Sequence, residues 1–332
     1  EYLELAAVGT VADSVPLYDE NRIIVREGFR RMKHPSNMGL GKLLESAGYD
    51  FKRKITSGFI GFGLAPRLNA GWRMGDAGRG VRLFTTNSEE EAASIAADLA
   101  VENEHRKETE QLILKQVTEN VEASWAIRNS RVMVVAGEGW HHGVIGIVSS
   151  RIKDMYYRPN ILLSVEDGVA TGSARSIEGF NLFDALCTCS DLMIKFGGHA
   201  AAAGMSLKAE NVPELAGRLN EYAKIHMDSQ MLVPVQRPEL RLKPSEVTVE
   251  LIELIQRMEP FGQDMPEPLA EISGQLSEVR KIGADGATLR MKIMDHRRSL
   301  GTVGFRRSIM ADYYWIIDGP IYDLSDVESQ RE

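Results

Sequence analysis

The residues best suited to bind an anion lie in one short run, from Lys195 to Gly204. Gly197 and Gly198 can adopt positive φ and let main-chain N–H groups come close to a ligand. His199 follows, with a ring nitrogen that can donate to a phosphate oxygen. These residues predict an anion-binding turn. The alternative is a tight turn that enters a buried strand, with His199 bonded to a backbone carbonyl.

Two further groups of donors precede this run. Ser173 and Arg175 are two residues apart, so on a strand they share one face. A guanidinium offers a forked pair of donors to a phosphate, and the serine hydroxyl adds a third. His141 and His142 stand directly before an apolar helix that begins near Gly143, where we expect free backbone N–H groups. Three donor-rich segments so close in sequence favour one phosphate-binding site.

The composition sets the class of protein. With 332 residues, 43% of them hydrophobic, the chain can form two or three globular domains. No run approaches the ~20 apolar residues of a membrane helix, and no signal-peptide pattern opens the chain. The two cysteines, Cys187 and Cys189, are too few for a zinc cage and typical of reduced thiols. We therefore expect a cytoplasmic protein with no membrane partner.

The formal net charge of −8 hides an uneven distribution. Residues 1–86 hold 13 Lys and Arg against 9 Asp and Glu, whereas residues 87–130 hold 4 against 10. An acidic protein can bind nucleic acid if its positive charge is gathered in one groove. Solvated helix faces are the alternative, and we favour it for Lys52, Arg53 and Lys54.

A long helix is predicted over residues 88–122. Ser88 can cap it, and Glu91 can complete a capping box. Apolar stripes occupy its two ends, while residues 102–111 are polar on every side. A helix with a solvated middle is expected to be a rod that joins two domains.

The other segments alternate between helical and strand patterns. The expected elements are an opening helix or strand to Val8 with a turn at Gly9, helices near Asn21–Arg31, Met38–Ala47, Val144–Met155, Pro213–Met227 and Val249–Met258, and strands at Arg131–Ala136, Asn160–Val165 and Ala287–Met294. The many glycines between Gly58 and Gly75 suggest a backbone shaped around a ligand. No convincing strand closes the chain after Ile316.

Five motifs, in order along nearly the whole chain, resemble the RecJ-type single-strand-specific exonucleases of the DHH phosphoesterase superfamily. They are Gly9–Leu17, Pro66–Asp76, Trp140–Ile147, Phe196–Gly204, and Met258–Gly262 together with Pro266–Pro268. The resemblance implies a multi-domain α/β protein. Residues 1–87 would be the C-terminal part of a DHH domain, and residues 88–122 would be a connector helix. Residues 123–232 would be a DHH-associated domain that binds phosphate and nucleic acid. Residues 233–332 would be an OB-fold-like β-barrel domain without an evident closing strand.

The resemblance also implies roles for single residues. Asp13 would be a metal ligand and, with His199, a catalytic residue. The residues implied as phosphate-binding are Arg73, His141, Ser173, Arg175, Gly197, Gly198 and His199. Asp13 and these donors would face each other across a gap that is wide enough for one strand. From the residues alone, a helix cap is the favoured interpretation of Asp13, and a surface arginine is the favoured interpretation of Arg73.

The sequence departs from the family pattern in two places. Gly71 and Trp72 replace an Ala-Gly pair, which puts a large indole next to Arg73. The family's Asp-x-Asp and Asp-His-His motifs are absent, and we expect them upstream of Glu1, since the sequence looks like a piece of a longer chain. Two-metal hydrolysis needs several carboxylates and imidazoles. We therefore expect this chain to be inactive alone.

The activity implied for the whole protein is 5′→3′ exonuclease digestion of single-stranded DNA in repair and recombination. The resemblance implies Mn²⁺ or Mg²⁺ as cofactor and single-stranded DNA as substrate, with a repair helicase or a single-strand-binding protein as a further partner. One alternative is a DHH phosphoesterase for short oligonucleotides or cyclic dinucleotides, which the extra β domain disfavours. Another is a DNA-binding scaffold that has lost its metals.

Overall fold

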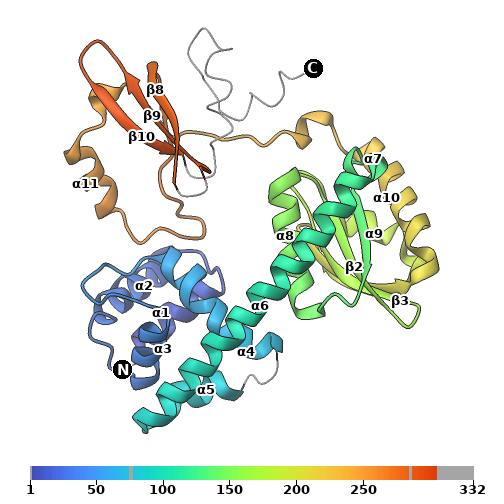
Figure 1. The fold of residues 1–332 in the computed structure, drawn as a ribbon, viewed down its shortest axis with the longest axis horizontal. Coiled ribbons are helices and arrows are strands. Elements are labelled where there is room, and N and C mark those ends of the chain that lie inside the picture. Colours follow the sequence, from blue (N-terminus) through green and yellow to red (C-terminus); the bar gives the residue numbers. More distant parts are fainter. Residues whose placement is uncertain (1, 75–77, 284–285, 305–332) are drawn as a thin grey trace. The chain divides into compact units, whose positions relative to one another are not determined.

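The computed structural model describes residues 2–74, 78–283 and 286–304, with the backbone alone at 72–74. The chain forms two compact units (Figure 1). The first unit comprises Glu1–Ala12 and Glu27–Val235, and the second comprises Asp13–Arg26 and Gln236–Glu332.

The N-terminal part of the chain is helical. Its elements are α1 (Leu3–Ala12), α2 (Asp19–Arg31), α3 (Met38–Ser46), the π-helix η1 (Phe59–Leu64), α4 (Ala65–Met74) and α5 (Gly78–Thr85). The predicted turn at Gly9 is wrong, because α1 continues through it. One glycine costs a helix about 1 kcal/mol, which the flanking alanines and leucines can outweigh.

Two glycines of this part allow helices to pack closely. A Cβ at Gly28 would lie 2.3 Å from Cβ of Ala7, and one at Gly39 would lie 1.9 Å from the carbonyl oxygen of Leu83. Between Gly58 and Gly63, within the predicted ligand-shaped stretch, the chain is instead largely helical. Glycine content in this region therefore reflects helix packing as well as backbone freedom.

The long predicted helix is confirmed as α6 (Glu89–Ala123). Ser88 is its N-cap, and its hydroxyl accepts a 3.2 Å hydrogen bond from the N–H of Glu91. The predicted capping box is incomplete, because the Glu91 side chain does not accept a hydrogen bond from the N–H of Ser88. The Glu91 carboxylate accepts hydrogen bonds from Thr86 and Arg82, and the N–H of Ser88 donates instead to Oγ1 of Thr86.

Removing this cap should weaken the first unit modestly. We expect Ser88→Ala to lower the free energy of unfolding by about 1 kcal/mol, because the N–H of Glu91 loses its acceptor. Ser88→Asp should retain most of the stability. Urea denaturation measures both, and equal stability of Ser88→Ala and the unchanged protein would contradict the assignment.

The middle of α6 is not solvated on every side, contrary to the prediction. Asn103, Arg106 and Glu110 are buried. Nη1 of Arg106 lies 2.5 Å from Oε2 of Glu110, and Nε of Arg151 on the helix α8 (His142–Tyr156) lies 2.5 Å from the other Glu110 oxygen. The frequent charges of residues 102–111 suggested exposure to solvent, but Glu110 is paired with both Arg106 and Arg151 where α6 packs on α8. The periodicity of a single segment does not show such pairing with another helix.

The α/β part contains a five-stranded sheet in the order β1-β2-β3-β5-β4, in which only β1 and β2 are parallel. Its strands are β1 (Met133–Glu138), β2 (Asn160–Glu166), β3 (Val169–Arg175), β4 (Met193–His199) and β5 (Ala202–Lys208). Its other helices are α7 (Trp125–Arg128), α9 (Leu182–Cys187) and α10 (Val212–His226), with 3-10 turns at 190–192, 209–211 and 229–232. The predicted strands and helices of this part are confirmed.

Two pairs of helices pack on the two faces of this sheet. On one face, α6 and α8 pack on β1 and β2 through residues such as Val117, Val148 and Leu162. On the other face, α9 and α10 pack on the sheet through residues such as Leu186 and Leu219 (Figure 1). Side chains alternate along each strand, so each strand contributes to both faces.

The second unit contains a three-stranded antiparallel sheet in the order β10-β9-β8 and a parallel pair of short strands. Its elements are β6 (Leu240–Leu242), a 3-10 turn at 244–246, α11 (Val249–Arg257), β7 (Ala270–Ile272), β8 (Gln275–Ile282), β9 (Thr288–Met294) and β10 (Ser299–Gly304). Nη1 of Arg22 donates a 2.9 Å hydrogen bond to the carbonyl of Pro260, which ties 13–26 to the rest of the unit. The segment after Ile316 lies outside the described residues.

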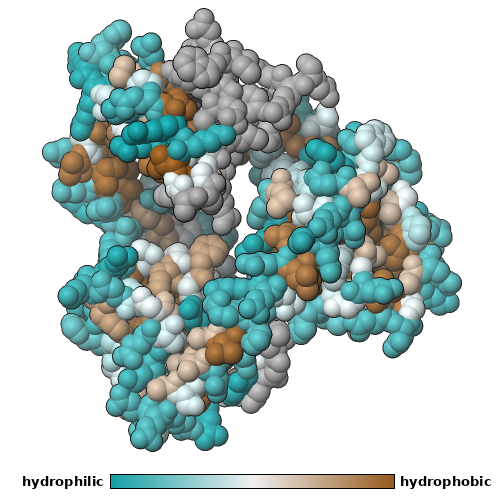
Figure 2. Space-filling view, viewed as in Figure 1, coloured by the Kyte–Doolittle hydropathy of each residue, from teal (hydrophilic) through white to brown (hydrophobic). Residues whose placement is uncertain are grey.

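No helix of the described residues is long and apolar enough to cross a membrane. Hydrophilic residues cover most of the face shown in Figure 2, and the hydrophobic residues there form separate small patches.

Candidate phosphate-binding site

The strand register brings three of the predicted donors onto one face of the sheet. Arg175 on β3 stands opposite Ala202 on β5, and Ala202 stands opposite His199 on β4. Directly opposite residues on neighbouring strands project from the same face. Arg175 and His199 therefore flank one small methyl group.

The adjacent row of the same face has the same arrangement. Ser173 stands opposite Gly204, which stands opposite Gly197. Gly197, Gly204 and His199 are exposed, so α8 covers this face near β3 but leaves it open over the part of β4 and β5 next to the hairpin turn; further along β5, Ser206 is buried. The result is a floor of glycine and alanine with polar side chains at its edges.

Residues 195–204 belong to a β-hairpin of β4 and β5 with a two-residue turn at Ala200 and Ala201. Its donors thus lie on a sheet face, which corrects the predicted anion-binding turn. Nδ1 of His199 accepts a 3.4 Å hydrogen bond from the N–H of Ala201, so the alternative of a bond to a carbonyl is also wrong. Gly198 has a φ of +152°, and a Cβ there would lie 2.4 Å from the carbonyl oxygen of Ala202.

Hydrogen bonds from two elements fix the Arg175 guanidinium. Nη1 donates to Oγ of Ser173 at 2.9 Å and to the carbonyl of Ala174 at 2.8 Å, while Nε donates to Oγ of Ser150 on α8 at 3.1 Å. Helix α8 can approach because Gly146 has no side chain. A Cβ there would lie 3.2 Å from Oγ of Ser173 and 3.3 Å from Nη2 of Arg175. The sequence analysis missed Ser150, although its position four residues after Gly146 places both on one helix face.

His141 caps the start of α8 through one ring nitrogen, and its predicted phosphate contact stays a prediction. It is the N-cap of α8, and its Nδ1 accepts a 3.1 Å hydrogen bond from the N–H of Gly143. Its carbonyl accepts from the N–H groups of Val144 and Ile145. The expectation of free N–H groups at the start of α8 is therefore wrong at these three residues, because His141 engages them.

Asp13 directly follows the last residue of α1 and is exposed. The alternative of an N-terminal cap is wrong, since this is the C-terminal end of the helix, where the helix dipole disfavours a carboxylate. Asp13 belongs to the second unit, whereas Ser173, Arg175 and His199 belong to the first. The gap expected between Asp13 and these donors stays a prediction.

The described residues do not by themselves form a two-metal site. Among them, no group of three or more His, Cys, Asp and Glu side chains could hold a metal ion. Asp13 can supply one oxygen ligand of the kind that Mn²⁺ and Mg²⁺ accept. Arg73 lies in α4, but its side chain and that of Trp72 are outside the described residues, so the predicted role of Arg73 stays a prediction.

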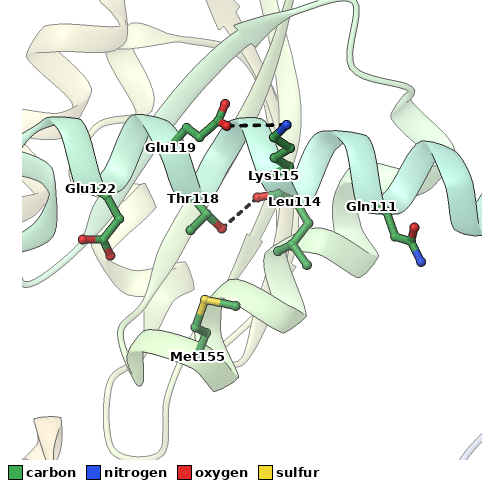
Figure 3. A pocket seen from close by; sticks show the side chains of 7 residues that line it. All are labelled: Gln111, Leu114, Lys115, Thr118, Glu119, Glu122 and Met155. Carbon is green, nitrogen blue, oxygen red and sulfur yellow. Dashed lines mark hydrogen bonds and ion pairs between the residues drawn. The ribbon is translucent and has the colours of Figure 1, made fainter. Parts of the chain in front are cut away.

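A hollow of about 390 Å³ between α6 and α8 has the wrong chemistry for a phosphate (Figure 3). Leu114 and Met155 line it together with Lys115, Glu119 and Glu122, and its exposed surface is almost entirely apolar. Burial, together with a hydrogen bond to Glu122, raises the pKa of Tyr156 beside it to about 12. The donors suited to an anion are thus on the open sheet face instead.

Comparison with known proteins identifies the two globular parts. Residues 129–225 match the DHHA1 domain, and residues 239–319 match the RecJ OB domain. The chain is 40% identical over 310 residues to the single-stranded-DNA-specific exonuclease RecJ of Bacillus subtilis, covering 92% of this chain and 39% of that protein. The chain therefore contains a DHHA1 domain and a RecJ OB domain, and it is similar to RecJ proteins over most of its length.

Other RecJ proteins agree. RecJ of Escherichia coli is 37% identical over 292 residues, which cover 85% of this chain and 50% of that protein. The crystal structure of Thermus thermophilus RecJ in complex with Mn²⁺ matches with a TM-score of 0.79 and 30% identity, covering 92% of this chain and 44% of that one.

These matches confirm the resemblance inferred from the five motifs and the predicted fold class. The chain spans between about two fifths and half of the length of the RecJ proteins named here. The predicted domain boundaries stay predictions.

Proposed function

We propose that this chain is part of an exonuclease that hydrolyses the phosphodiester bonds of single-stranded DNA from the 5′ end, with Mn²⁺ or Mg²⁺ as cofactor. The observation that carries the proposal is the register that aligns Ser173, Arg175 and His199 on one open sheet face. The relatives are named single-stranded-DNA-specific exonucleases, and Thermus thermophilus RecJ has been solved with Mn²⁺ and with Mg²⁺. Bound metal would activate water and stabilise the leaving oxygen.

The residues of the sheet face bind and orient the strand. Arg175 contributes a fixed positive charge, held by Ser150 and Ser173. Because Oγ of Ser173 accepts from Arg175, its own proton can be donated to a phosphate oxygen. Because Nδ1 of His199 accepts from Ala201, the neutral ring carries its proton on Nε2, which can donate to the same phosphate.

The remaining parts of the proposal rest on the family resemblance. They are the polarity of digestion, the role in repair and recombination, a cytoplasmic setting, and a helicase or single-strand-binding protein as partner. Asp13 is proposed as a metal ligand and Arg73 as a further phosphate contact. His141 is proposed as a further phosphate contact through Nε2, since its cap of α8 uses Nδ1 alone.

Arg175→Gln removes the charge of this side chain and should weaken binding of a 5′-phosphorylated single strand to this chain about tenfold or more. The reason is that a charge-assisted hydrogen bond contributes roughly 1.5–3 kcal/mol. Ser173→Ala should have a smaller effect. The matched control is Arg218→Gln on α10, an exposed arginine paired with Asp191 and Glu214. Fluorescence anisotropy at fixed low salt measures all three. Equal affinities of Arg175→Gln and Arg218→Gln would contradict the site.

The predicted alternative of a dinucleotide or short-oligonucleotide phosphoesterase is less well supported. The match of residues 239–319 to the RecJ OB domain argues against it, since a dinucleotide needs no extended strand contact. The scaffold alternative stays a prediction, since the described residues do not by themselves form a two-metal site and a scaffold would need none.

A further inference from the structure

A third row of the same sheet face places an exposed lysine at its β4 edge, in line with His199, while the middle residue of this row, Ser206, is buried. Thr171 on β3 stands opposite Ser206 on β5, and Ser206 stands opposite Lys195 on β4. Lys195, Gly197 and His199 alternate along β4, so they share the open face. Lys195 is exposed, and no ion-pair partner is found for it in the part of the chain that the structure describes.

A β-bulge sets the end of this face. The pairing of β4 with β5 shifts between Met193 and Lys195. Met193 and Phe196 both pack against the core under α9 and α10, although a regular strand would point residues three apart to opposite faces. The extra residue is Ile194, which is 60% exposed. Such bulges re-aim side chains beside functional sites.

The spacing of the rows matches an extended nucleic-acid strand. Successive rows are two residues apart, or about 6.7 Å along the strands. This distance is close to the phosphate-to-phosphate repeat of a stretched single strand. The first row holds Arg175 and His199, whose phosphate Ser173 also reaches from the neighbouring row through its position beside the Arg175 guanidinium. The third row holds Lys195, and the exposed Gly197 and Gly204 leave the second row open between them.

We propose that Lys195 binds the third phosphate of a strand whose first phosphate is held by Arg175 and His199. The sheet face then aligns the strand along β4, with its first phosphate at the hairpin turn and its third at the bulge. This inference rests on the proposed function. The Lys195 ammonium group is a point charge at a fixed distance from the first phosphate, so its contribution to the binding affinity depends on the length of the strand.

The test compares two probes, 5′-phosphorylated thymidine oligomers of two and four nucleotides, binding to this 332-residue chain. Lys195→Gln should weaken binding of the four-nucleotide probe roughly three- to tenfold and leave the two-nucleotide probe unchanged, because the shorter probe has no third phosphate. With a twelve-nucleotide strand, the slope of log affinity against log salt should fall by about 0.7. Lys224→Gln on α10, an exposed lysine paired with Glu221, is the matched control.

Two results would overturn the inference. One is equal weakening of both probes by Lys195→Gln, which would indicate general attraction rather than a defined phosphate contact. The other is no difference between Lys195→Gln and Lys224→Gln. Arg175→Gln separates this test from the proposed function, since it should weaken both probes. If Arg175→Gln has no effect on either probe, the proposed function of the face fails independently of Lys195.

Discussion

Asp13→Ala should lower the metal-dependent release of nucleotides from a 5′-labelled single strand at least ~100-fold, since even residues that only support a metal ligand cost 10–100-fold when removed. The assay uses this chain joined to the portion of a RecJ relative that it does not span. The exposed Asp13 carboxylate lies at the C-terminal end of α1, where the helix does not favour it. A bound cation would offset that cost.

The control for this prediction is Asp50→Ala, an exposed aspartate close to Arg53. It should leave the activity unchanged. Calorimetric titration with Mn²⁺ provides a second readout, and Asp13→Ala should reduce the affinity for the metal in parallel with activity. Undiminished nuclease activity and unchanged Mn²⁺ affinity would reject Asp13 as a ligand.

Glu110→Gln should destabilise the first unit by roughly 3–5 kcal/mol, which is the usual cost of removing one partner from a buried ion pair. The side chain of Glu110 is 3% exposed and that of Arg106 is 9% exposed, so the Arg106 charge would stay buried without its carboxylate. The contact with Arg151 on α8 would weaken as well.

Urea denaturation followed by tryptophan fluorescence can measure this effect. Trp140 is buried in the cluster that joins α6 to α8, and its Nε1 donates a 2.7 Å hydrogen bond to Gln116 on α6. The matched control is Glu119→Gln, which removes an exposed pair with Lys115 and should cost less than about 0.5 kcal/mol. Similar losses for both variants would show that the Glu110 contact is no stronger than a surface pair.

Local patterns in the sequence predicted the elements that position the site. The cap at Ser88 defined the start of α6, and the alternation of Ser173 and Arg175 placed both on one strand face. Both depend on residues near each other in the chain. The alignment of His199 with Arg175 was not predictable in this way, because it depends on β5 lying between β3 and β4.

Contacts between distant segments account for the errors as well. Residues 102–111 look solvated because their charges are frequent, yet Glu110 is buried against Arg151, forty-one residues further along. Ser150 gave no signal of its own, since its role depends on the close approach of Gly146 to β3. The close packing at Gly28 and Gly39 likewise depends on partners in other helices.

The most direct test of the account is a structure of this chain with a 5′-phosphorylated thymidine tetranucleotide. The account predicts one phosphate within hydrogen-bond distance of both the Arg175 guanidinium and Nε2 of His199, above the floor of Gly197, Ala202 and Gly204. A strand bound elsewhere, with no phosphate on this sheet face, would contradict it.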